Sequence, residues 1–182
     1  MASKKQRDRS WRDVRAVLSK ASHRDLLGLV GDLYALRKEN QDFLNARFLN
    51  DASTLAPYKE TIERYISPAE PWKNPVKISL ARKAISDYRK AIGDPHGLAQ
   101  LMLYYVECGV SFTLEFGDID ETFYDSVVRM FSDAMTMLNR CDQDVVDELL
   151  PRFESAVYST AGIGWGFHDS LRDTFEMYSQ DA

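Results

Sequence analysis

The sequence has few of the residues that most often form reactive or metal-binding sites. Its 182 residues include two cysteines, Cys108 and Cys141, and three histidines that lie far apart in the chain. Two cysteines do not make a disulfide framework, and none of these residues has the spacing of a zinc or di-iron site. Serine nucleophile motifs and a phosphate-binding loop are also absent. We therefore expect no metal and no cofactor, and we lean against an enzyme.

Long apolar runs and the alternating pattern of strands are lacking too. The most apolar stretch, which follows Pro95, is interrupted by Gln100, Glu107 and Glu115, and charge at bilayer depth is costly. The first residues, MASKKQRDRS, are basic but lack the apolar region of a secretory signal. Two cysteines without a framework suit a reducing compartment. We predict a cytoplasmic protein that makes no membrane contact.

Lysine is missing after Lys90, and the charge is divided unevenly along the chain. Residues 1–93 hold 19 Lys and Arg against 11 Asp and Glu, whereas residues 94–182 hold 4 against 17. Such a division fits a basic arm that binds an anionic partner beside an acidic body. It equally fits two halves that attract each other within one fold, which is the interpretation we favour.

The stretch from Asp94 to Arg140 predicts two long helices that fold back on each other at residues 117–120. Asp94 is a good N-cap, Pro95 suits the first helical position, and Gly117 can take the left-handed conformation that ends a helix. The first helix carries two apolar stripes at helical spacing, namely Leu98, Leu101, Met102, Tyr105, Phe112 and Phe116, and Leu103, Val106, Val110 and Leu114. A helix that is apolar over most of its circumference is normally buried.

We predict an all-α fold of seven or eight helices, packed as antiparallel pairs around a buried central helix at residues 95–117. The pairs form a bundle or a short solenoid-like stack. Residues 1–9 are predicted to be a disordered basic N-terminus, and residues 10–182 a single helical domain. We also expect Trp72, in the proline-rich loop 67–77, to plug the core, and Pro151 to bend or restart its helix.

One narrow face of the first hairpin helix is polar and provides the first candidate site. It carries Gln100, Tyr104, Glu107, Ser111 and Glu115, which helical spacing places in line. A solvent-facing stripe is the commoner explanation. The functional alternative is the wall of a groove with Glu107 at its centre.

The segment GIGWGFHD, residues 162–169, provides the second candidate. Its glycines permit backbone conformations that other residues avoid. As a site, His168 could act as an acid or base with Asp169 orienting it. As structure, which we favour, the glycines turn the chain while Trp165 and Phe167 anchor the last helix. A ligand-binding or catalytic cleft would require Glu107 to converge with this segment.

Nucleic-acid binding is a further hypothesis that depends on the basic half of the chain. The candidate residues are Lys4, Lys5, Arg7, Arg9, Arg12 and Arg15, with Lys83, Arg89 and Lys90 as a second patch. A binder would gather them on one face and lose affinity steeply with salt. A solvated charged face is the commoner explanation.

Four blocks carry a resemblance to a known family. They are FLNARF (43–48), KAISDYRKA (83–91), LMLYYVECGVSFTLEFGDIDETFY (101–124) and GIGWGFHD (162–169). They resemble an uncharacterised family of small all-helical bacterial proteins, a domain-of-unknown-function family. The resemblance implies a bacterial, cytoplasmic, all-helical protein. That family has no assigned activity, so the resemblance supplies no catalytic residues.

The leading functional hypothesis is a non-enzymatic interaction module whose partner is another protein or a second copy of the chain. The support is the lack of a catalytic constellation together with the charge division. The first alternative is a nucleic-acid-associated protein that uses the basic N-terminal half. The second is a small-ligand or enzymatic cleft built on Glu107 and His168.

Overall fold

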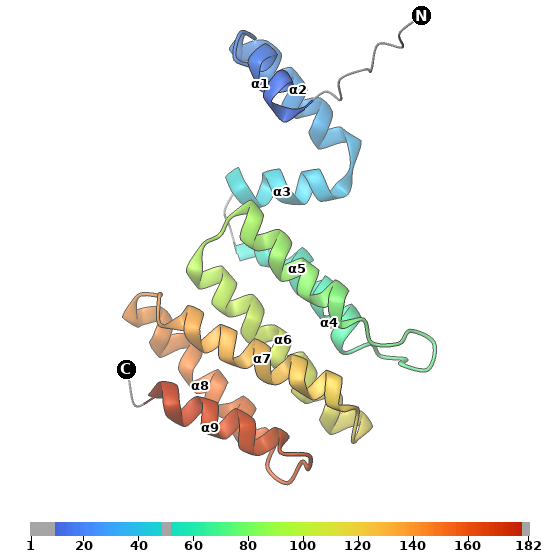
Figure 1. Cartoon of the computed structure of the whole chain (residues 1–182), viewed down its shortest axis with the longest axis vertical. Helices are drawn as coiled ribbons and strands as arrows, with labels where there is room; N and C mark the ends of the chain where they lie inside the picture. Colours follow the sequence, from blue (N-terminus) through green and yellow to red (C-terminus); the bar gives the residue numbers. More distant parts are fainter. Residues whose placement is uncertain (1–9, 49–51, 180–182) are drawn as a thin grey trace, which may run out of the picture. The chain divides into compact units, whose positions relative to one another are not determined.

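Every regular element in the part of the chain that the structure describes is a helix (Figure 1). The computed structural model describes residues 10–48 and 52–179, and these contain nine α-helices, one short 3₁₀ helix and no strand. The all-α prediction is confirmed, with more α-helices than the seven or eight expected. The N-terminus predicted to be disordered, residues 1–9, lies outside the described residues.

The chain divides into two compact units, residues 1–42 and 43–182, whereas the sequence predicted one domain from residue 10. The first unit contains α1 (Trp11–Leu18), α2 (His23–Leu36) and the first residues of α3 (Lys38–Phe48). At the start of α2, the Ser22 hydroxyl accepts the backbone N–H of Asp25 at 3.1 Å. The Asp25 carboxylate accepts the Ser22 backbone N–H in return, which completes a capping box. Neither α1 nor α2 has a buried residue.

The second unit is built from successive helices that pack on their near neighbours in the chain. After the end of α3 come the 3₁₀ helix η1 (Ala52–Leu55), α4 (Ala56–Ile66), α5 (Ile78–Ala91), α6 (Pro95–Phe116), α7 (Glu121–Leu138), α8 (Gln143–Ser159) and α9 (Phe167–Ser179). The main contacts of α4 are with α5 and α6, while α7 packs on α6 and α9. Figure 1 shows α6 between α5 and α7.

Helix α6 begins and ends where local chemistry predicts. The Asp94 side chain accepts the backbone N–H of Gly97 at 2.7 Å, Pro95 takes the first position, and Gly117 has a φ of +82°. Thirteen of the 22 residues of α6 are buried, and the helix packs on α4, α5, α7 and α8. The expectation that Leu114 is buried with its apolar stripe is wrong, because its side chain, near the C-terminal end of the helix, is 57% exposed.

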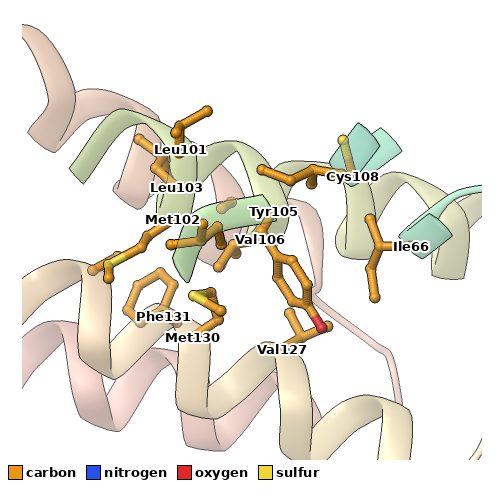
Figure 2. Packing of buried hydrophobic residues seen from close by; sticks show 14 of the residues in the cluster. Ile66, Leu101, Met102, Leu103, Tyr105, Val106, Cys108, Val127, Met130 and Phe131 are labelled. Atoms are coloured by element: carbon orange, nitrogen blue, oxygen red, sulfur yellow. The ribbon is translucent and has the colours of Figure 1, made fainter. Parts of the chain in front are cut away.

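The largest helix interface of the second unit joins α6 and α7. Figure 2 shows Met102, Tyr105 and Val106 of α6 facing Val127 and Phe131 of α7. Four of these five side chains are fully buried, and Met102 is 2% exposed. Their burial removes about 1.5–3 kcal/mol of unfavourable hydration per large side chain. This interface is therefore a major contributor to the stability of the unit.

Two glycines in α6 allow the neighbouring helices to approach closely. A Cβ atom at Gly97 would lie 1.9 Å from the Tyr88 hydroxyl oxygen, and one at Gly109 would lie 2.7 Å from Cγ2 of Val127. Both distances are far below a normal carbon contact. The sequence of α6 thus sets its spacing from α5 through Gly97 and from α7 through Gly109.

Two local predictions are corrected by the structure. Trp72 is 71% exposed, because residues 70–74 form a turn and Val76 and Ile78 fill the space against the core instead. A restart at Pro151 is wrong, since α8 continues from Gln143 to Ser159 with this proline on its exposed side, and the alternative of a bend there stays a prediction.

Candidate functional site

The polar face of α6 is used largely to tie α6 to other helices. The Tyr104 hydroxyl donates to Glu63 of α4 at 2.9 Å. Gln100 donates to Glu148 of α8 at 3.3 Å. Ser111 and Glu115, which continue the stripe, are exposed. The stripe is therefore divided between contacts with α4, contacts with α8, and solvent.

Glu107, the centre of the predicted groove wall, forms an ion pair. Its two carboxylate oxygens accept hydrogen bonds from Nε and Nη2 of Arg152, at 2.9 and 2.7 Å. Both side chains retain about a third of their exposure, 31% for Glu107 and 35% for Arg152. A two-point pair of this kind fixes geometry, although its partial exposure keeps its contribution to stability at roughly 1 kcal/mol or less. Glu107 therefore links α6 to the middle of α8.

The groups beside Glu107 are poorly suited to neutral-pH chemistry. Burial, as the main cause, raises the pKa of the Cys108 thiol to about 12. Burial also raises the pKa of Tyr104, and the nearby Cys108 and Glu63 add to that rise. Lys59 lies over the Tyr104 ring, with Nζ 5.4 Å from the ring centre. Cys108 is consequently a protonated core residue, since the thiolate is the nucleophilic form.

The glycine-rich corner turns the chain between α8 and α9. Gly162 and Gly166 have φ values of +87° and +70°, and Trp165 has a φ of +61°. Phe167 is 1% exposed and packs on the ring of Tyr124 at 4.6 Å between centres. Trp165 is 82% exposed. The interpretation that both aromatics anchor the last helix is thus correct for Phe167 and wrong for Trp165, which the left-handed turn directs outward.

His168 is held by the buried side chain of Thr160. The Thr160 hydroxyl donates its one hydrogen to the Val157 carbonyl oxygen at 2.7 Å and lies 3.0 Å from Nδ1 of His168. With its hydrogen on the Val157 carbonyl, the hydroxyl accepts from the ring, which favours the tautomer with the hydrogen on Nδ1. Asp169 does not orient this ring, because its carboxylate pairs with Arg172 at 3.2 Å.

Glu107 and His168 have no partner in common among the described residues. Their partners on or next to α8, Arg152 and Thr160, are eight residues apart, which is roughly 12 Å along a helix. Neither Glu107 nor His168 lines any of three hollows that described residues of the second unit form. The residues proposed for a shared cleft therefore divide between two separate local networks.

One of these hollows, about 640 Å³, follows the proline-rich loop beside Tyr65 and Lys77. The other two, about 350 and 480 Å³, share Arg89, Met102 and Asp133 and form one continuous groove between α5 and α7. We name it the α5–α7 groove. The sequence places Arg89 in a basic patch, but it does not predict that Arg89 and Asp133 line the same groove, because helical spacing does not reveal which helices become neighbours.

The basic candidates are only partly within the described residues. Arg12 and Arg15 are exposed on α1. Lys4, Lys5, Arg7 and Arg9 lie outside the described residues. In the second patch, Lys83 pairs with Asp87 of the same helix.

The feature that sequence reasoning missed most clearly is the exposed apolar surface of the first unit. Nine large apolar side chains are exposed on α1 and α2: Trp11, Val14, Val17, Leu27, Leu29, Val30, Leu33, Tyr34 and Leu36. We call this set the α1–α2 apolar surface. The signal was available, because the apolar residues of α2 cover more of its circumference than one packed face requires.

Comparison with known proteins adds no assignment. No family model matches the chain, and neither a curated protein nor a solved structure matches it. Among residues 10–48 and 52–179, no group of three or more His, Cys, Asp or Glu could hold a metal ion. None of the helices in these residues combines the length and apolar character that a membrane crossing requires.

Proposed function

We propose that this protein is a non-enzymatic interaction module that docks on another protein through the α1–α2 apolar surface. The observation that carries the proposal is that neither α1 nor α2 has a buried residue, although together they present nine large apolar side chains. Scattered single apolar residues on a surface are ordinary, whereas nine on two helices without a buried residue favour an interaction site.

The exposed side chains are of the kind that contributes most to binding. Trp11 is 68% exposed, and Leu27 and Leu36 are 60% and 69% exposed. Burying each would contribute roughly 1.5–3 kcal/mol, and several are needed because association itself costs roughly 4–15 kcal/mol. Tryptophan and tyrosine are enriched among the residues that dominate interfaces, which makes Trp11 and Tyr34 the expected anchors.

The backbone of α2 supports a close partner. A Cβ atom added at Gly28 or at Gly31 would meet nothing within 4 Å. These glycines therefore leave open space on the helix, and a second helix could approach the backbone there. They weaken α2 by about 1 kcal/mol each against alanine, a cost that packing by a partner would offset.

A site-specific crosslinking experiment tests this proposal. A photoreactive residue is placed at Leu27, and in a matched control at Ser155, which is exposed on α8. We expect a defined crosslinked product only from position 27, and its loss when Leu33→Glu adds a charge to the same surface. A product with a second copy identifies self-association, and one with another polypeptide identifies a partner protein. A monomer whose only crosslinks lie within its own chain would refute the proposal.

Three finer statements belong to the same proposal. We place α6 at the structural centre of the second unit, with helix pairs stacked in a solenoid-like way, because α6 packs on four other helices. We place the protein in the cytoplasm, because Cys108 and Cys141 are both free. The resemblance to an uncharacterised bacterial helical family agrees with an all-helical fold and adds no activity.

A further inference from the structure

The α5–α7 groove combines an apolar floor with a basic rim. Its floor contains Met102 and Leu98 of α6, which are 2% and 3% exposed, with Met130 of α7 beside them. Its rim contains Arg82 and Arg89 on one side. Both hollows that make up the groove are partly open to solvent, so a ligand would lie along the helices instead of being enclosed.

The rim arginines are available to an incoming ligand. The side chains of Arg89 and Arg140 make no hydrogen bond or ion pair with any of residues 10–48 and 52–179. Arg82 acts only at a distance: burial raises the pKa of Tyr105, and the charge of Arg82 opposes part of that rise. Lys83 is engaged by Asp87. Three free guanidinium groups therefore line the groove.

The single acidic residue of the lining does not cancel this charge. Asp133 is the one carboxylate among the described residues that line the groove, and it has no ion pair with Arg89 or Arg140. Three free guanidinium groups against one carboxylate leave a surplus of positive charge. Arg82 and Arg89 belong to the basic half of the chain, residues 1–93, whereas Arg140 belongs to the half that holds 17 Asp and Glu against 4 Lys and Arg. The groove thus brings basic side chains from both halves of the chain together.

The spacing of the rim defines what fits. Arg82 and Arg89 are seven residues apart on α5, which places them on one side and roughly 10 Å apart. Two carboxylates seven residues apart on another helix have the same separation. Apolar residues three and four positions after the first carboxylate would face the methionine floor, and methionine adapts readily to different side chains.

We propose that the α5–α7 groove binds an acidic amphipathic helix of a partner protein. The helix carries carboxylates at positions i and i+7 and apolar residues between them, and arginine forks match carboxylates well. Nucleic acid is the less suitable occupant, because none of the described lining residues is aromatic and no base could stack there. The groove lies in the second unit and the α1–α2 apolar surface in the first, so this inference does not depend on the proposed function.

The test uses a defined probe and the full-length chain. The probe is a fluorescein-labelled helical peptide with Glu at i and i+7 and Leu at i+3 and i+4, and binding is followed by fluorescence anisotropy. We expect saturable binding that Arg89→Glu weakens by about five- to tenfold, because it reverses one contacting charge. The matched control is Arg129→Glu, an equal charge change at an exposed arginine of α7 outside the groove lining, for which we expect less than a twofold effect.

Two further arms separate this inference from its alternatives. A peptide with Lys in place of both Glu should bind the Arg89→Glu protein better than it binds the wild type, as a charge contact at residue 89 predicts. The Leu27→Glu variant of the α1–α2 apolar surface should bind the Glu peptide normally, so failure of one proposal leaves the other in place. Equal losses from Arg89→Glu and Arg129→Glu, no binding of the Glu peptide, or tighter binding of a single-stranded oligonucleotide would each overturn the inference.

Discussion

Replacing Gly109 by alanine tests whether α6 and α7 are held at the distance described above. The added Cβ atom would lie 2.7 Å from Cγ2, 3.4 Å from Cγ1 and 3.7 Å from Cβ of Val127. Normal carbon contacts are about 3.5–4.0 Å, so Cγ2 must move by about 1 Å. Val127 is fully buried and its branched side chain has little rotational freedom. Overpacking of this kind costs roughly 1–3 kcal/mol, against a gain of about 1 kcal/mol in helix propensity.

We therefore expect Gly109→Ala to lower the free energy of unfolding by up to about 2 kcal/mol. In the Val127→Ala background both Cγ atoms are gone, and the nearest remaining atom, Cβ of residue 127, is at an ordinary 3.7 Å. There the same substitution should raise stability by about 0.5–1 kcal/mol, because only the propensity gain and some cavity filling remain.

Urea unfolding of the four proteins, followed by circular dichroism, measures this reversal of sign. Hydrogen exchange of α6 and α7 amides verifies that the second unit is the part that unfolds. Gly28→Ala in α2 serves as a control for the propensity gain, since nothing lies within 4 Å of its added Cβ. An equal loss of stability from Gly109→Ala in both backgrounds would show that Val127 is not the cause.

Three more predictions follow from buried or strained groups. Ser126→Ala should lower the free energy of unfolding by about 1–3 kcal/mol, because it removes the hydrogen-bond partner of the buried Tyr105 hydroxyl, 2.7 Å away. Adding Tyr105→Phe should recover part of the lost stability in urea unfolding, and no recovery would contradict this account. Burial raises the pKa of Cys108 from 9.0 to about 12, so the stability that the buried thiol contributes should be complete below pH 9 and be lost as the pH rises toward 12. The difference in unfolding free energy between the wild type and Cys108→Ala should therefore change over that range. A constant difference would contradict this account. Trp165→Gly should raise the free energy of unfolding, measured by thermal unfolding, by up to about 1 kcal/mol, because glycine tolerates the φ of +61° and the tryptophan side chain is exposed. A loss of similar size would show that the indole makes a stabilising contact.

The features that the sequence predicted well depend on chemistry within a few residues. Asp94, Pro95 and Gly117 mark the ends of α6 because capping and left-handed turns are local. The features it predicted poorly depend on distant partners. Spacing placed Glu107 on a polar face, but its partner Arg152 is 45 residues away. Trp165 was expected to anchor the last helix, but the backbone conformation of the corner leaves its side chain exposed.

The order in which helices pack in the second unit has a consequence for how fast it folds. Its main helix contacts join elements that are adjacent in the chain or separated by a single element. Closing such short loops costs little chain entropy, and proteins dominated by local contacts fold in microseconds to milliseconds. The α6–α7 hairpin is the largest of these contacts and can form before the helices on either side have docked. Folding would then spread outward from α6 in both directions along the chain, so a chain emerging from the ribosome could begin to assemble this unit before α8 and α9 are complete.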